Sequence, residues 1–93
     1  MTQAIWKYSF EITDYFELPL PFGAKVLLVE MQGEQPCIWA MVEASNTPEA
    51  RTFSVVGTGH PLPNGEYIGT FQQPPFVWHL FETAPLPPTE REE

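Results

Sequence analysis

Residues 25–43, which read KVLLVEMQGEQPCIWAMVE, decide the fold of this chain. The run from Lys25 to Met31 is apolar and rich in β-branched residues, and a turn signal at 32–35 follows it. After Pro36, the segment 37–43 carries apolar side chains at both odd and even positions, which is typical of a strand covered on both faces. The stretch therefore predicts a β-hairpin whose second strand is central in a sheet.

Two other segments, at residues 5–12 and 51–56, show the two-residue period of half-buried strands, and two last strands are expected at 67–71 and 76–82, around the turn at 72–75. The segment Leu18–Gly23 contains two prolines, so we expect it to be extended but not a central strand. A single helical turn at Pro48–Arg51 would not change the class. The chain is predicted to be all-β, a small antiparallel β-sandwich or barrel of about six short strands.

The 93 residues are enough for one domain, and 43% of them are hydrophobic. We expect a single β domain over residues 1–83. Residues 84–93 hold three prolines and a charged end, which predicts a flexible, Pro-rich acidic tail. The large aromatic side chains at strand spacing should fill the core; they are Trp6, Phe10, Trp39, Phe53, Phe71 and Trp78.

The chain is acidic, with 12 Asp and Glu against 4 Lys and Arg and a net charge of -8. This balance argues against nucleic-acid binding and favours a basic partner. The single cysteine, Cys37, cannot form an internal disulfide, which favours a reducing cytoplasm. The N-terminal residues show no signal-peptide pattern, and the longest apolar stretch, Val26–Val29, is too short to span a membrane.

The segment Gly57–Gly65 contains three glycines and two prolines, which predicts an irregular loop between two strands. Its glycine spacing matches neither a dinucleotide fingerprint nor a Walker loop. We expect Gly57 and Gly59 to adopt positive φ. The alternative to a purely structural loop is contact with a ligand or partner, for which Thr58, Gly59 and His60 are the candidate binding residues.

No catalytic residue, metal site or cofactor is predicted. His60, His79 and Cys37 lack the paired spacing of zinc motifs, and Cys37 has no cation nearby in sequence to activate its thiol. No Gly-x-Ser-x-Gly motif occurs, so we do not expect an enzyme. His79 lies within a predicted strand, where a hydrogen-bonded structural role is expected, whereas His60 should be exposed.

A second candidate contact surface lies in the Pro-rich connection, where Tyr15, Phe16 and Phe22 have the acidic neighbours Asp14 and Glu17. Aromatic groups bordered by charge on a loop are typical of an interaction patch. The alternative is that these side chains pack across an edge of the sandwich.

The run Val56-Gly57-Thr58-Gly59-His60-Pro61, followed by Tyr67-Ile68-Gly69-Thr70-Phe71-Gln72, resembles a family of short bacteriophage and prophage proteins of unassigned function. Segments such as Trp6-Lys7-Tyr8 and Pro36-Cys37-Ile38-Trp39 extend the resemblance over residues 5–82. The resemblance implies a small protein made in the cytoplasm of an infected bacterium. It brings no catalytic residues.

From its small size, its charge and this resemblance, we expect the chain to be a non-enzymatic accessory protein that binds a host protein, for example a component of antiviral defence. Its acidic surface would meet a basic patch. One alternative is an oligomer that sequesters a nucleotide signal, using Gly57–His60 for backbone donors and Lys7, Lys25 or Arg51 for charge. Another is a minor structural protein of the virion. Self-association stays open.

Overall fold

The computed structural model describes residues 2–84, and within them the chain forms seven strands and no helix. Every strand pairing is antiparallel. The strands are β1 (Gln3–Ser9), β2 (Phe16–Pro21), β3 (Lys25–Gln32), β4 (Gln35–Glu43), β5 (Pro48–Gly57), β6 (Gly65–Gln73) and β7 (Phe76–Thr83). The all-β prediction is confirmed. The predicted tail lies, apart from Ala84, outside the described residues.

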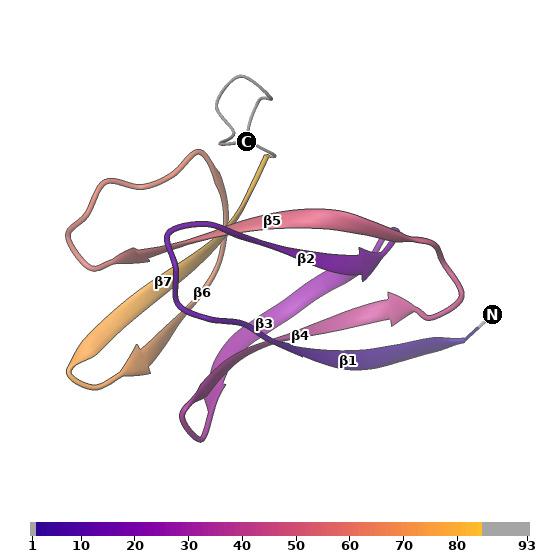
Figure 1. The fold of residues 1–93 in the computed structure, drawn as a ribbon, viewed down its shortest axis with the longest axis horizontal. Coiled ribbons are helices and arrows are strands. Elements are labelled where there is room, and N and C mark those ends of the chain that lie inside the picture. Colours follow the sequence, from indigo (N-terminus) through magenta and orange to yellow (C-terminus); the bar gives the residue numbers. More distant parts are fainter. Residues whose placement is uncertain (1, 85–93) are drawn as a thin grey trace.

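The strands form two sheets, one in the order β1-β4-β3 and the other in the order β2-β5-β7-β6 (Figure 1). The hairpin predicted from residues 25–43 is β3–β4, and β4 is central in the three-stranded sheet, as its two apolar faces indicated. The edge strands β3 and β6 lie against each other and close one side of the sandwich. No helix in the described part of the chain could cross a membrane.

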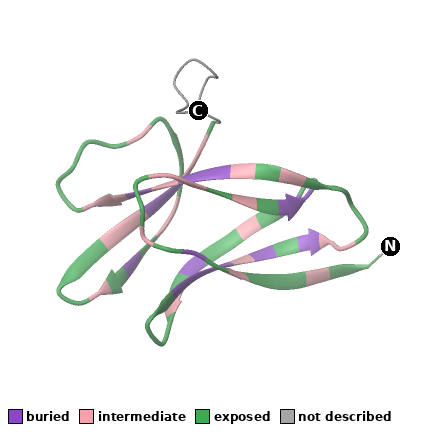
Figure 2. Cartoon of the chain, viewed as in Figure 1, coloured by how far each residue is buried: buried purple, intermediate pink, exposed green. Residues whose placement is uncertain are grey.

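The core lies between the inner faces of the two sheets (Figure 2). Phe10, Phe53 and Phe71 are buried there, as predicted. The three tryptophans are not: Trp6 is 40% exposed, and Trp39 and Trp78 are half-buried. Trp6 does lie on the inner face of β1, but β1 is an outer strand that the opposite sheet covers only partly. The alternation in sequence therefore gave the correct face but not the depth of burial.

The strand boundaries differ from the prediction in three places. Residues 16–21 are a true strand, β2, which pairs with β5 alone. An edge strand tolerates proline because one side of its backbone needs no partner. β1 ends at Ser9 rather than at residue 12, and Pro48–Arg51 belongs to β5 rather than to a helical turn. The addition of β2 raises the number of strands from six to seven.

One ion pair joins β5 to β7 on the inner side of the four-stranded sheet. The guanidinium of Arg51 pairs with the carboxylate of Glu82, with 3.0 Å between Nη2 and Oε1, and both side chains are largely buried. Arg51 also donates from Nη1 to the carbonyl oxygen of Ala24 at 2.8 Å. The hydrogen bond to Glu82 raises the pKa of Arg51 above its ordinary value. The pair therefore connects two strands and the segment before β3.

Candidate functional site

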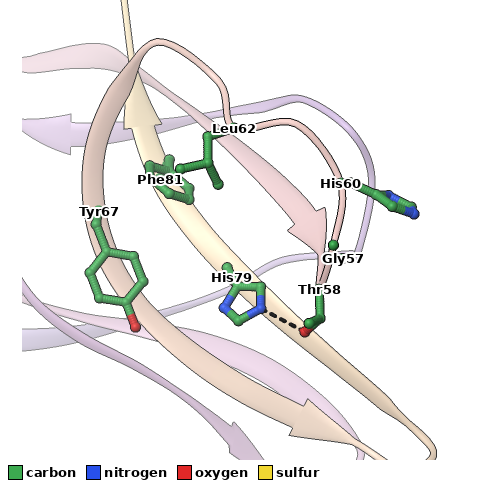
Figure 3. A pocket seen from close by; sticks show the side chains of 8 residues that line it. Gly57, Thr58, His60, Leu62, Tyr67, His79 and Phe81 are labelled. Atoms are coloured by element: carbon green, nitrogen blue, oxygen red, sulfur yellow. Dashed lines mark hydrogen bonds between the residues drawn. The ribbon is translucent and has the colours of Figure 1, made fainter.

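An open pocket of about 370 Å³ lies on the outer surface of the four-stranded sheet, beside the loop 58–64 (Figure 3). Strands β6 and β7 supply its floor, and the end of β5 with the following loop supplies its rim. The lining residues are Gly57, Thr58, Gly59, His60, Leu62, Tyr67, His79 and Phe81. Because Leu80 is fully buried toward the other sheet, its neighbours His79 and Phe81 point outward. The pocket thus lies outside the core.

A β-bulge in β6 shapes the floor of the pocket. The register of β6 on β7 shifts between Tyr67 and Gly69. In a regular strand Tyr67 and Thr70 would point to opposite faces, but the extra residue places both on the outer face. The Tyr67 hydroxyl lies 2.5 Å from Oγ1 of Thr70, and the Tyr67 ring meets Phe81 edge to face at 5.6 Å. The bulge therefore adds an aromatic hydroxyl to the pocket.

Both ring nitrogens of His79 are hydrogen bonded, which confirms the role expected for this residue. Nε2 lies 2.8 Å from Oγ1 of Thr58, and Nδ1 lies 2.9 Å from Oγ1 of Thr70 (Figure 3 shows the bond to Thr58). A neutral imidazole donates at one nitrogen and accepts at the other, and a hydroxyl does both. Since Thr70 also meets Tyr67, a continuous hydrogen-bond chain runs from β6 across β7 to the loop.

The pairing of Thr58 with His79 has the spacing of a nucleophile and its general base. In such sites a third group, usually a carboxylate, stabilises the imidazolium that forms. Here that place is taken by the neutral hydroxyl of Thr70, and no carboxylate lines the described pocket. Residues 2–84 also hold no group of three His, Cys, Asp or Glu side chains placed to bind a metal ion. The arrangement orients His79 for hydrogen bonding.

The cations considered for a nucleotide ligand lie elsewhere. Lys7 donates to Gln32 on the three-stranded sheet, and Lys25 begins β3 in that same sheet. Arg51 is held by Glu82 on the inner side of the four-stranded sheet. None of these three side chains lines the pocket. Within one copy of the described chain, the pocket is therefore not lined by the lysine or arginine side chains with which proteins commonly neutralise phosphate.

The acidic connection between β1 and β2 is attached to the outer face of the same sheet. Ser54 lies opposite Phe81 in the pairing of β5 with β7, so the two side chains share the outer face. Ser54 donates from Oγ to the carbonyl oxygen of Asp14 at 2.8 Å. This bond holds the β1–β2 connection to the face of the sheet that carries the pocket. The exposed carboxylates of Glu11, Asp14 and Glu17 belong to that connection and to the start of β2.

The loop residues predicted from sequence meet in this pocket. Thr58, Gly59 and His60 all line it, and His60 is exposed, with its ring turned away from His79 (Figure 3). Gly59 has the expected positive φ of 91°. Gly57 does not, because it is the last residue of β5 and keeps an extended backbone. That prediction was wrong for Gly57.

The three aromatic residues of the Pro-rich connection do not form one patch. Phe16 stacks on Phe10 and on Phe53, with ring centroids 4.7 and 5.3 Å apart, so it extends the core. Phe22 follows β2 at the opposite end of the strand and is 64% exposed. Tyr15 directly precedes β2 and is half-buried. For Phe16, packing at the edge of the sandwich is the correct alternative.

Sequence reasoning missed four residues of the site, namely Leu62, Tyr67, Thr70 and Phe81. A usable signal was the isolated Gly69 within a strand pattern, which often marks a bulge. A Cβ at Gly69 would lie 3.0 Å from Cγ1 of Val29, so glycine also permits the close approach of β6 to β3. A bulge predicted at Gly69 would have placed the side chains of Tyr67 and Thr70 on the same face of the sheet.

The model of one protein family, described as a domain of unknown function (DUF7352), matches residues 1–91. No curated protein and no solved structure matches the chain.

Proposed function

This chain belongs to the DUF7352 family, and we propose that it is a phage- or prophage-encoded accessory protein that binds a host protein in the bacterial cytoplasm. The observation that carries the proposal is the setting of the pocket. Its lining is mostly apolar and uncharged, and Asp14, whose side chain is exposed, is held through its carbonyl oxygen by Ser54 on the same outer face of the sheet. Protein interfaces combine a desolvated apolar centre with a polar border in the same way.

The charge of the molecule favours a basic partner. Residues 2–84 hold nine carboxylates and three cations, so at least six carboxylates have no cation of their own within this part of the chain. Arg51 is already held by Glu82. An excess of one sign raises the rate of association with an oppositely charged surface and makes binding sensitive to salt.

The pocket itself suits one anchoring side chain of the partner. Leu62 is 69% exposed and Tyr67 is 55% exposed, so both offer apolar surface that a partner would cover. The hydroxyls of Tyr67 and Thr58 can donate to or accept from a polar atom at the tip of that side chain. A basic residue next to the anchor would then meet Asp14. Anchors of this kind carry most of the binding energy in many interfaces.

The pocket volume also favours a second candidate function, the binding of a small uncharged molecule. About 370 Å³ lies within the range of sites for small ligands. The hydroxyl and imidazole groups would fix its orientation.

Affinity capture from a bacterial lysate tests the proposal, with the tagged full chain and two variants of equal net charge. Glu11→Gln with Asp14→Asn removes two carboxylates of the β1–β2 connection, and Glu49→Gln with Glu66→Gln removes one from β5 and one from β6. We expect a basic protein to be captured by the wild type and the second variant, and much less by the first. Capture should weaken as salt rises from about 50 to about 500 mM, because screening shortens the reach of exposed charges.

Two results would contradict this function. Equal capture by both double variants would mean that the position of the carboxylates is irrelevant. Recovery of a small molecule without any basic protein would instead support the second candidate. Recombinant partner and chain, mixed at known concentrations, should reproduce the difference between the two variants as a change in dissociation constant.

A further inference from the structure

The two sheets have four edge strands, and three of them are protected against pairing with another strand. β3 and β6 lie against each other, so each covers the other's edge. β2 carries Pro19 and Pro21, which have no backbone donor to offer. Within residues 2–84, β1 is the one edge strand that neither packs against another edge strand nor contains proline.

β1 is a regular and firmly held strand. All seven residues from Gln3 to Ser9 pair with β4 without a bulge, and none of them is proline or glycine. The pairing continues beyond both ends, through Ala44 N to Thr2 O at 3.0 Å and Phe10 N to Pro36 O at 3.1 Å. Figure 1 shows β1 at the outer margin of its sheet. Its outward backbone groups therefore form a straight row that is ready to pair.

Each face of β1 exposes one large apolar side chain. Ile5 is 61% exposed on the outer face, and Trp6 is 40% exposed on the inner face. The strand carries one charge, that of Lys7. A strand added beside β1 would cover Ile5 and Trp6 and would pair with the outward-facing backbone groups of β1. An exposed edge strand is a template for pairing of this kind.

We infer that β1 pairs antiparallel with β1 of a second copy of this chain, so that the two three-stranded sheets become one sheet of six strands. In such a twofold pair the residue at the axis lies opposite its own copy. Trp6 is the middle residue of β1, and a pair centred on it uses the whole strand.

This register makes the strand complementary to itself. A small side chain, that of Ala4, lies opposite a large one, that of Tyr8, and the aliphatic stem of Lys7 covers the side chain of Ile5. No like charges lie opposite each other, whereas a pair centred on Lys7 would bring two ammonium groups together. The opposed residues are Gln3 with Ser9, Ala4 with Tyr8, Ile5 with Lys7, and Trp6 with Trp6.

Dimerisation through β1 responds to salt in the opposite sense to the proposed binding of a host protein. Each copy has a net charge of -8, so two copies repel each other, and salt screens that repulsion. We therefore expect the dimer to strengthen with salt while binding to a basic partner weakens. The two proposals can fail independently.

Sedimentation equilibrium of the full chain over a range of concentrations tests the dimer, with Ile5→Lys and Ile5→Glu as a matched pair. The wild type should approach twice its 10.6 kDa mass. Both variants remove the same apolar side chain, but the introduced lysine faces Lys7 of the second copy and the introduced glutamate forms an ion pair with it. We expect Ile5→Lys to dimerise at least about tenfold more weakly than Ile5→Glu, because each contact occurs twice.

The charge of the whole molecule predicts the reverse order, since Ile5→Glu makes each copy more acidic. If the wild type stays monomeric, the inference is overturned, and β1 would instead be available to pair with a strand of another protein. A dimer in which Ile5→Lys is as strong as Ile5→Glu also overturns it. Leu62→Lys, exposed on the distant loop, should leave the dimer intact. If a variant fails to fold, hydrogen exchange of the wild type decides, because β1 amides should gain protection with concentration.

Discussion

Two polar clusters on β7 differ in what they do for the molecule, although their β7 residues, His79 and Glu82, are only three positions apart. Glu82 points to the inner side of the sheet, where it holds Arg51, and both side chains are largely buried. His79 points to the outer side, where two threonine hydroxyls hold its ring beside an open pocket. The alternation of one strand thus separates an ion pair that supports the fold from a hydrogen-bonded cluster available for contact.

The two clusters differ in how much of their surface and how many of their hydrogen-bonding groups remain available to a partner. The guanidinium of Arg51 already has the carboxylate of Glu82 and the carbonyl oxygen of Ala24. The hydrogen-bond chain through His79 ends at Tyr67, whose hydroxyl is bonded but which is 55% exposed as a residue. We therefore expect substitutions in the first cluster to affect stability, and substitutions in the second to affect binding.

The largest effect should come from Arg51→Ala. It leaves the carboxylate of Glu82 largely buried without its cation and frees the carbonyl oxygen of Ala24. We expect a loss of about 2 to 4 kcal/mol in the free energy of unfolding, measured by urea denaturation. Arg51→Lys keeps the charge but not the two-pronged contact, so its loss should be smaller. Equal stability of Arg51→Ala and wild type would mean that the ion pair is dispensable.

His79→Ala should cost less. It removes two hydrogen bonds from a half-buried site where water can replace them. We expect a loss of about 1 kcal/mol in the same urea measurement. Thr70→Val, which interrupts the chain without removing the ring, is the matched control and should cost no more than this. A loss as large as that of Arg51→Ala would make the His79 cluster part of the framework.

The difference between the clusters also explains what the sequence could predict. The sequence predicted a strand at residues 76–82, and the two-residue alternation of any strand then determines which of its side chains share a face. The sequence also identified β4 as central because apolar residues occupy both of its faces. These features depend on near neighbours in the chain, so local pattern is sufficient.

The missed features depend on partners far away in sequence. β2 is a strand in spite of Pro19 and Pro21 because β5 pairs with only one side of it. Tyr67 and Thr70 share a face because of a bulge, which a rule of strict alternation excludes. Trp6 stays exposed because no strand lies beyond β1 in its sheet. In each case the neighbour in space, and not the residue itself, decides the outcome.

Tyr8 offers a third case, a buried hydroxyl without a hydrogen-bond partner in the described part of the chain. Tyr8→Phe should leave stability unchanged or raise it by up to about 1 kcal/mol, because it removes an unsatisfied polar group and keeps the ring. Burial raises the pKa of Tyr8 above 10.0. The unfolded chain therefore loses this proton first, and wild-type stability should fall as pH rises above about 10.

Urea denaturation at several alkaline pH values compares the two proteins. The fall should be shallower for Tyr8→Phe, which has no proton to lose at this position. A clear loss of stability at neutral pH would mean instead that the hydroxyl does have a partner.

The smallest effect on stability should come from His60→Ala, although this residue lines the same pocket as His79. Its side chain is exposed, its ring is turned away from the His79 cluster, and its backbone N–H to the carbonyl oxygen of Gly57, at 3.2 Å, survives the substitution. We expect thermal unfolding to report a change of no more than about 0.5 kcal/mol. If His60 is an anchoring contact for the host protein, the same substitution should weaken binding by about 2 kcal/mol or more. Measuring stability and binding on one preparation distinguishes a contact residue from a structural one. If the melting temperature falls sharply and binding is lost only in proportion to the folded fraction, the loop supports the fold, as the Arg51 cluster does.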